Sequence, residues 1–397
     1  MRIGLLTYYW EDNPGQFFQG LSTVNALRRA CPADQVEIPD IRPWDQRKRC
    51  ISLRDMCYRP WRNLHRKRKR RRYGRARQDV PIVGPKVVVA HPAKATQELA
   101  SRKYDLLVVG SDTTLHLWGD GRYTDNLPPM YWLGDLPDTP RVTLASCSHT
   151  DRYEDLSPTQ ARIMSAAVKK FSFLGVRDEL TAELLSKLGP AEGVEPRVIP
   201  DPTFSYEVDP EPARLLLNRR RLGRKRPLCG LHLAWPSPVK RQLAALLSQH
   251  YEVLDLGGQY SGCTALVSSG PYEWSGLFSH LALHVTTSYH ETIFALKQGT
   301  PVFTVEGAEH RFDPVSKSSK IVSLWRKLGR LDSNYLNPHL DDVTGDEAFA
   351  RVEAMVKSYD PAQAARQASE FGAQFAQAVD DAIHAALPTR EGSVGKS

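Results

Sequence analysis

The sequence has no apolar run that approaches the roughly 20 residues needed by a membrane-spanning helix. Its first residues, MRIGLLTYYWEDN, also lack the layout of a secretory signal peptide, because the apolar stretch is short and runs into Glu11 and Asp12. We therefore expect a cytoplasmic protein, and the sequence leaves open whether it attaches to the inner face of the membrane.

Paired cysteines and the common phosphate-binding loops are missing as well. The 6 cysteines are scattered along the chain and none forms a C-x-x-C pair, so neither a disulfide framework nor a zinc ribbon is indicated, and we predict no metal. No G-x-x-x-x-G-K loop occurs, and no G-x-G-x-x-G follows the first predicted strand. The sequence therefore gives no sign of a P-loop enzyme or of a dinucleotide-binding one.

The composition is that of a folded protein with an excess of positive charge. Of the 397 residues 41% are hydrophobic and 25% are charged, which suits a globular chain of two α/β domains. The net charge of +8 suggests an anionic ligand, nucleic acid or an acidic membrane surface. Most of the excess comes from Arg62–Arg77 (RNLHRKRKRRRYGRAR), and the rest of the chain is nearly balanced.

Two successive series of strands and helices predict the domain organisation. We expect an N-terminal Rossmann-like domain over 1–206 with a basic insertion at about 40–80, a linker over 207–226, and a second Rossmann-like domain over 227–345. Helices over 346–387 and a disordered tail over 388–397 complete the prediction. The fold class is thus α/β, with two Rossmann-like domains facing a cleft in the manner of GT-B transferases and with C-terminal helices.

Short apolar runs bounded by turn residues mark the expected strands. The predicted strands are Ile3–Thr7, Val87–Val89, Leu106–Val109, Arg141–Ser146, Phe173–Val176, Leu228–Leu233, Val253–Leu256, His284–Thr287 and Pro301–Val305. Ser157-Pro158 with Gln160 predicts the start of a helix. Leu277–Leu283 is predicted to be helical, as is His290–Gln298. Polar residues that follow these strands are where a ligand is expected.

An ordered set of motifs resembles one family. The motifs are YDLLVVGSD at Tyr104–Asp112, the strand before Cys147-Ser148-His149, FSFLGVRDE at Phe171–Glu179, Asp201-Pro202-Thr203, TTSYHETIFALKQGTP at Thr286–Pro301 and the basic segment Lys317–Tyr335. Together they are similar to the polysaccharide pyruvyl transferases, and the late motif resembles the TSFHG-like segment of one branch. The resemblance implies a GT-B-like pair of domains. It also implies transfer of the enolpyruvyl unit of phosphoenolpyruvate to a sugar as a pyruvate ketal, with no cofactor besides that co-substrate.

The chain departs from the family pattern in its late motif. Better-characterised branches have an arginine two residues before the histidine, where this chain has Ser288, and a glycine after it, where this chain has Glu291. The family arginine that would hold a donor carboxylate or phosphate is therefore missing from this position.

Histidines that follow strands are the candidate catalytic groups, because an imidazole titrates near neutral pH and suits acid–base work. His290 opens a predicted helix after a strand, and the alternative is a histidine that only caps the helix. His149 also follows a strand, and its alternative is a hydrogen-bonded structural role.

Cations and capping residues near the same strand ends are the candidate binding groups. For the donor we name Arg177, Ser288, His310, Arg311 and Lys317, with Lys320 close by; a surface ion pair or a solvated charge is the alternative for each cation. For the acceptor we name Asp112 and His116, although Asp112 is equally suited to capping a turn.

Two other functions remain open at this stage. The same fold suits a glycosyltransferase with a nucleotide-sugar donor, although the second domain shows no paired acidic residues that we would assign to ribose recognition. A non-catalytic polyanion-binding protein would use Arg62–Arg77, which lacks the interleaved aromatics of a nucleic-acid stacking platform. That segment suits an anionic membrane surface or an acidic glycan equally well, or it is a solvated helix face. Nucleic acid is not expected as a partner. The acceptor is a sugar or glycoconjugate, lipid-linked or free, and the sequence leaves the oligomeric state open.

Overall fold

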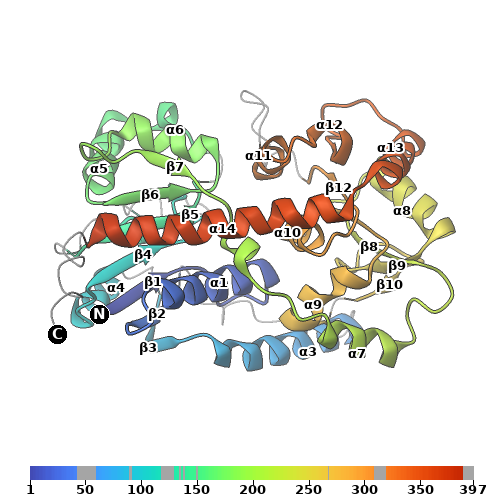
Figure 1. The fold of residues 1–397 in the computed structure, drawn as a ribbon, viewed down its shortest axis with the longest axis horizontal. Coiled ribbons are helices and arrows are strands. Elements are labelled where there is room, and N and C mark those ends of the chain that lie inside the picture. The colour runs from blue at the N-terminus through green and yellow to red at the C-terminus, as the bar shows by residue number, and fades with distance from the viewer. Residues whose placement is uncertain are drawn as a thin grey trace. The chain divides into compact units, whose positions relative to one another are not determined.

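A computed structural model describes residues 1–42, 60–88, 92–117, 129–133, 136, 139–148, 151–266, 268–307 and 319–387. The chain divides into two compact units (Figure 1). Unit 1 comprises residues 1–50, 77–205 and 371–397, and unit 2 comprises residues 51–76 and 206–370. Within the described residues, no helix combines the length and apolar character needed to cross a membrane.

Unit 1 is built on a 7-stranded parallel sheet in the order β3-β2-β1-β4-β5-β6-β7. Its strands are β1 (Arg2–Leu6), β2 (Gln35–Arg42), β3 (Ile82–Val88), β4 (Leu106–Val109), β5 (Arg141–Ser146), β6 (Phe173–Val176) and β7 (Pro196–Val198). Its helices include α1 (Pro14–Ala30), α4 (Pro92–Ser101), α5 (Pro158–Val168) and α6 (Glu179–Leu188). Short 3-10 turns lie at η2 (Arg77–Asp79), η3 (Met130–Trp132), η4 (Tyr153–Asp155) and η5 (Pro202–Ser205). The strand order reverses between β1 and β4, which is where such sheets place their ligands.

Unit 2 is built on a 6-stranded parallel sheet in the order β10-β9-β8-β11-β12-β13. Its strands are β8 (Leu228–His232), β9 (Glu252–Asp255), β10 (Thr264–Ala265), β11 (Leu283–Thr286), β12 (Val302–Val305) and β13 (Tyr335–Leu336). Its helical elements are α3 (Pro60–Ala76), α7 (Glu211–Arg220), α8 (Pro238–His250), α9 (Pro271–Leu277), η6 (Phe278–His280), α10 (Tyr289–Lys297), α11 (Lys320–Lys327), α12 (Leu331–Asn334) and α13 (Gly345–Ser358). The last helix, α14 (Pro361–Ala386), begins in unit 2 and continues into unit 1. Here the order reverses between β8 and β11.

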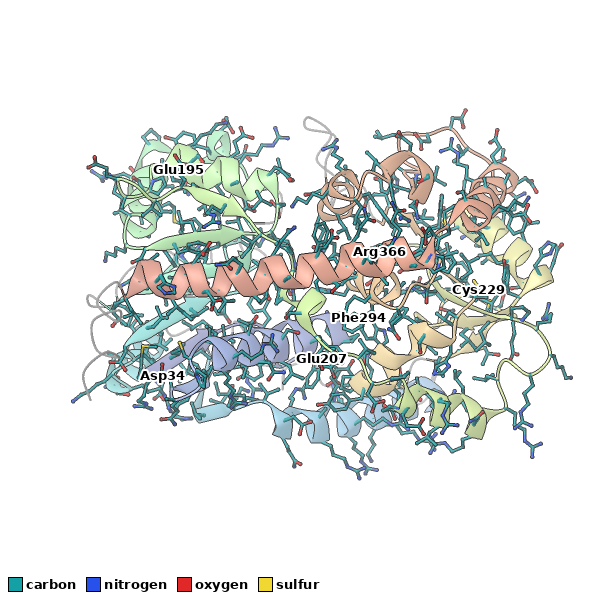
Figure 2. The ribbon with its side chains drawn as sticks, viewed as in Figure 1. Asp34, Glu195, Glu207, Cys229, Phe294 and Arg366 are labelled. Carbon is teal, nitrogen blue, oxygen red and sulfur yellow. The ribbon has the colours of Figure 1, made fainter. Side chains whose placement is uncertain are left out.

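Buried apolar strands and ring contacts hold each sheet to its helices. β4 reads LLVV and is buried at every position, as expected for a parallel strand covered on both faces. In unit 2, Cys229 of β8 and Phe294 of α10 are fully buried (Figure 2). Phe294 lies edge-on to Trp274, with ring centroids 4.9 Å apart. Ser157 and Gln160 form the expected capping box at the start of α5. The predicted α/β class with two Rossmann-like parts is confirmed.

Several predicted boundaries differ from the structure. The region 207–226, predicted to be a linker, contains α7, and the basic segment forms α3 and belongs to unit 2 rather than to the N-terminal part. The predicted helix Leu277–Leu283 is correct only in its first part. Helix α9 begins earlier, at a proline whose fixed φ suits a first turn, and ends at Leu277, the 3-10 turn η6 follows over Phe278–His280, and Leu283 already belongs to β11. The tail 388–397 lies outside the described residues.

The loop after β4 depends on Gly110. Its φ is +144°, and a Cβ atom at this position would lie only 2.0 Å from the backbone oxygen of Leu144 in β5. The next residues continue the pairing with β5, because Asp112 bridges Ser146 and accepts a 2.9 Å hydrogen bond from the backbone N–H of Cys147. The glycine in the GSD motif is therefore required by close backbone packing.

We predict that Gly110→Ala lowers the free energy of unfolding by at least ~3 kcal/mol, because the methyl group meets backbone in a conformation that L-residues avoid. Gly193→Ala is the matched control: its φ is +77° and no atom lies within 4 Å of the added Cβ. That change should cost only about 1 kcal/mol. Chemical denaturation of both variants tests this, and equal losses would contradict it.

Candidate active site

The carboxyl ends of β8 and β11 bring together the polar residues of unit 2. These two strands are neighbours, and the strand order reverses between them. His232 is the last residue of β8, while α10 begins directly after β11. This is the position at which open parallel sheets bind their ligands.

Hydroxyl groups shape the turn from β11 into α10. The Ser288 hydroxyl caps α10 by accepting a hydrogen bond from the backbone N–H of Glu291 at 3.5 Å. The Thr286 hydroxyl accepts from the backbone N–H of Ser288 at 2.9 Å. The capping role expected of Ser288 is thus present, and His290 stands in the first turn of the helix, where free backbone N–H groups attract anions.

Glu291 carries a buried carboxylate that is held by three side chains. One oxygen lies 2.8 Å from Nδ1 of His232, and the other lies 3.1 Å from Nε2 of His284 and accepts a 2.7 Å hydrogen bond from Thr286. Burial alone would raise the pKa of Glu291, but the two histidines outweigh it and hold that pKa well below its usual range. Burial would lower the pKa of His232, yet the charge and hydrogen bond of Glu291 raise it above its ordinary value of 6.5.

His232 differs from its partners because it reaches solvent. Its side chain is 30% exposed, whereas those of Glu291 and His284 are 4% and 0% exposed. The ring edge lies against Gly257, where an added Cβ would come within 2.9 Å of Cδ2. Asp255 and Lys69 also act on its charge, and Lys69 places the basic helix α3 beside this site.

The ammonium group of Lys320 lies beside the first turn of α10. The Lys320 ammonium is 5.6 Å from the ring centroid of Tyr289, a cation–π contact. Tyr289 and His290 are themselves 5.4 Å apart, centroid to centroid. The structure therefore places Lys320 near the position where the family arginine is missing.

In unit 1, Arg177 directly follows β6 and is buried beside acidic partners. Its guanidinium side chain is 1% exposed and lies 3.1 Å from the Asp201 carboxylate and 3.7 Å from that of Asp112. It also donates a 2.9 Å hydrogen bond to Sγ of Cys147. Asp201 accepts further hydrogen bonds from Gln19 at 2.7 Å and from the Thr203 hydroxyl at 2.7 Å. These contacts tie together several elements of unit 1, and the role of Arg177 in donor binding stays a prediction.

The other predicted site residues are distributed as follows. His116 lies in unit 1 with its Nδ1 2.8 Å from the Asp151 carboxylate, while Asp112 lies beside Arg177. Their acceptor-binding roles stay predictions. His149, His310, Arg311 and Lys317 lie outside the described residues.

Among the described residues, no group of three or more His, Cys, Asp or Glu side chains could hold a metal ion. His280 and His284 stand four residues apart in the sequence, a spacing that can bind metal on a helix. They point to different partners here, since His280 contacts the backbone oxygen of Pro210 and His284 contacts Glu291.

A model of the polysaccharide pyruvyl transferases matches residues 13–308. The chain belongs to this family. The match runs from α1 to β12, and it includes α10 and Arg177, which directly follows β6. It confirms the family expected from the motifs but not the branch with the TSFHG-like motif. The chain is accordingly a transferase by family.

Solved structures similar to this family member share its fold. UDP-GlcNAc 2-epimerase from Neisseria meningitidis bound to UDP-GlcNAc has a TM-score of 0.52 at 10% identity, covering 98% of this chain and 100% of that chain. UGT71G1 from Medicago truncatula complexed with UDP-glucose has a TM-score of 0.50 at 10% identity, covering 96% of this chain and 98% of that chain. HepE from Anabaena in complex with UDP has a TM-score of 0.50 at 13% identity, covering 98% of this chain and 100% of that chain. No curated protein matches the sequence. These likenesses confirm the GT-B-like α/β fold alone.

Sequence reasoning missed His232, His284 and Glu291 as members of the site. His232 lies inside the predicted strand Leu228–Leu233, whereas His290 and Arg177 follow their predicted strands; in the structure His232 is the last residue of β8. Glu291 was noticed only as a departure from the family glycine. His284 lies inside an apolar strand, where a buried histidine gives no signal of its own.

We predict that Asp201→Asn destabilises this family member by about 3 kcal/mol, because it leaves the buried Arg177 guanidinium without its main counter-charge. Asp381→Asn is the control, since it breaks an Arg–Asp pair of similar length, 2.8 Å to Arg197, on the surface of the same unit. Such exposed pairs contribute less than about 1 kcal/mol. Chemical denaturation measures both, and a surface-like loss for Asp201→Asn would refute the buried-pair account.

The Glu291–His232 pair should make stability depend on pH. The lowered pKa of Glu291 adds stability above its ordinary value of 4.5, and that stability is lost as the pH falls toward the lowered value. The raised pKa of His232 adds stability that is complete below 6.5 and is lost as the pH rises through the raised value. Both contributions are therefore complete between pH 4.5 and 6.5.

We predict that the melting temperature of Glu291→Gln falls furthest below that of the natural chain in this window, and that the gap narrows toward pH 8. Thermal unfolding at a series of pH values measures it. Glu353→Gln, at an exposed position on α13 in the same unit, is the control and should show no such dependence. A gap that is constant with pH would contradict the pairing.

Proposed function

We propose that the chain transfers the enolpyruvyl unit of phosphoenolpyruvate to two hydroxyl groups of a sugar in a glycan or glycoconjugate, which makes a pyruvate ketal. The observation that carries this proposal is the family match over residues 13–308. The arrangement at the carboxyl ends of β8 and β11 supports it, because acid–base groups and cations meet there at the reversal point of the sheet.

The reaction needs few groups. One sugar hydroxyl adds to C2 of the enolpyruvyl unit while C3 gains a proton and becomes a methyl group. The second hydroxyl then attacks C2 and displaces phosphate, and its proton leaves with that phosphate. The enzyme must therefore provide an acid, a base and cations for the donor carboxylate and phosphate.

His290 and the first turn of α10 are assigned to the donor and its chemistry. His290 follows Ser288, which caps the helix, so the neighbouring backbone N–H groups suit an anion. Lys320 supplies the cation that replaces the family arginine, since its ammonium lies over the ring of the residue before His290. Backbone dipoles and one cation suit a small, highly charged donor.

Helix α3 extends the positive charge toward the same site. Lys69 is close enough to act on His232, and Arg68 and Arg72 act together with Arg219 and Arg220 of α7. We assign this surface to an acidic glycan or to the phosphate of a lipid-linked acceptor, by attraction of opposite charges. The acceptor sugar itself is not assigned.

Thermal stabilisation by candidate donors tests the proposal. A ligand that binds the native state raises the melting temperature by mass action, so phosphoenolpyruvate should raise it and a panel of nucleotide sugars should not. A shift with a nucleotide sugar and none with phosphoenolpyruvate would replace the proposal with a glycosyltransferase. Binding of neither, together with binding of polyanions through α3, would point to a non-catalytic protein.

We predict that Lys320→Gln raises the dissociation constant for phosphoenolpyruvate about 10-fold or more, because a charged contact contributes about 1.5–3 kcal/mol. Isothermal titration measures the constant. Lys357→Gln is the control, since Lys357 is an exposed lysine in the last turn of α13 in the same unit. Unchanged affinity in Lys320→Gln would remove Lys320 from the donor site and leave the proposed reaction in place.

A further inference from the structure

Glu291 faces two histidines, and only one of them can take up a positive charge at low cost. His284 is fully buried, and its Nδ1 has no hydrogen-bond partner among the described residues. Opposite that nitrogen is the backbone of Gly230, where even a Cβ atom would come within 2.5 Å. A charged His284 would bury an N–H group without an acceptor, which is costly, so His284 carries its one proton on Nε2 and donates it to Glu291.

His232 is the histidine that can be charged. Its Nδ1 lies 2.8 Å from Glu291, and its side chain is 30% exposed. Its Nε2 makes no hydrogen bond with any residue that the structure describes, and is therefore available to a substrate. The carboxylate fixes the ring orientation through Nδ1, as in other acid–base histidines that are held by a third group.

The other charged groups that face His232 leave this pairing intact. Asp255 of β9 accepts hydrogen bonds from four successive backbone N–H groups, those of residues 257–260, at 2.5 to 2.9 Å. The Asp255 carboxylate is therefore hydrogen-bonded to the loop that carries Gly257, and not to His232. Lys69 of α3 opposes a charge on His232, but the effect of Glu291 is greater. Glu291 has the largest effect of these charged groups on His232, followed by Asp255 and Lys69.

We propose that His232 is the catalytic acid that protonates the methylene carbon of the donor, and that Glu291 is the positioning residue that holds its imidazolium. The inference rests on the proposed function and assigns one of its steps. His232 gives its Nε2 proton to C3, and the π-electron pair of the double bond forms the new C–H bond. The first sugar hydroxyl bonds to C2 and its proton passes to His290. When the second hydroxyl displaces phosphate, two protons remain: the one that His290 took from the first hydroxyl and the one from the second hydroxyl. One of them returns His232 to its charged form, and the other leaves with the phosphate.

The test measures phosphate release from phosphoenolpyruvate by the full chain, with p-nitrophenyl glycosides that carry free 4- and 6-hydroxyls as acceptors. His232→Asn keeps a donor near Nδ1 and so preserves the contact with Glu291, but it removes the Nε2 acid. We expect its kcat to fall about 100-fold or more, with the KM for phosphoenolpyruvate changed less than about threefold. His250→Asn, an exposed histidine on α8 that stacks on Phe349, is the control and should retain full activity.

The pH profile distinguishes positioning from a structural role for Glu291. Because the acid must be protonated, the rate of the natural chain should fall as the pH rises through the raised pKa of His232. In Glu291→Gln that alkaline limb should move to lower pH, giving a loss of about tenfold or more at pH 8. Histidine NMR titration of the same variant should show the pKa of His232 falling.

Three outcomes overturn the inference. Normal turnover in His232→Asn would exclude the acid role while leaving the proposed reaction standing. An unmoved alkaline limb in Glu291→Gln would exclude the positioning role even if both variants lose rate. No phosphate release by the natural chain with any of these acceptors would remove the proposed function, and the inference with it.

Discussion

A carboxylate stays charged inside a protein only when hydrogen-bond donors replace the water that it loses. The arrangement around Glu291 in unit 2 follows from this constraint. Two histidines and one hydroxyl are held against its oxygens, and they come from β8 and β11, the strands between which the sheet order reverses. Satisfying the carboxylate thus fixes the ends of two strands and the first turn of α10. His232 is the group of this set that reaches solvent, and it is therefore the one that we propose acts on the substrate.

Unit 1 also contains a buried carboxylate, that of Asp201, whose hydrogen-bond donors hold elements of the unit together. Asp201 is fully buried and is satisfied by Arg177, Gln19 and Thr203, which come from different elements around the carboxyl end of the sheet. Arg177 is buried in turn, with 1% of its side chain exposed. The arginine and DPT motifs that resemble the family therefore anchor unit 1 in this structure, whereas Glu291, a departure from the family in the late motif, is the buried partner of the partly exposed His232.

Strands and their order of appearance could be predicted because buried parallel strands are short apolar runs, such as Leu106–Val109 and Phe173–Val176. The site could be predicted only where a polar residue follows such a run, as at His290 and Arg177. Whether that residue faces solvent or a buried carboxylate depends on contacts between distant segments. His232 and Glu291 are 59 residues apart, and Arg177 and Asp201 are 24 apart. Contacts between residues so far apart produce no recognisable pattern in a short stretch of sequence. The assignment of α3 to unit 2 likewise depends on tertiary contacts, which composition does not reveal.

The two departures in the late motif change the charge at the start of α10 in the same direction. Serine in place of arginine removes a positive charge from the start of α10, and glutamate in place of glycine adds a negative one, which the helix N-terminus tolerates well. Left alone, this change would repel an anionic donor. Glu291 instead raises the pKa of His232 and so restores a cation at the same strand ends, while Lys320 adds another over Tyr289. The family arginine is permanently charged, but an imidazolium can also release its proton. In the proposed reaction, one ring would therefore combine charge binding with acid catalysis, and the proposed donor site would be sensitive to pH in a way that an arginine site is not.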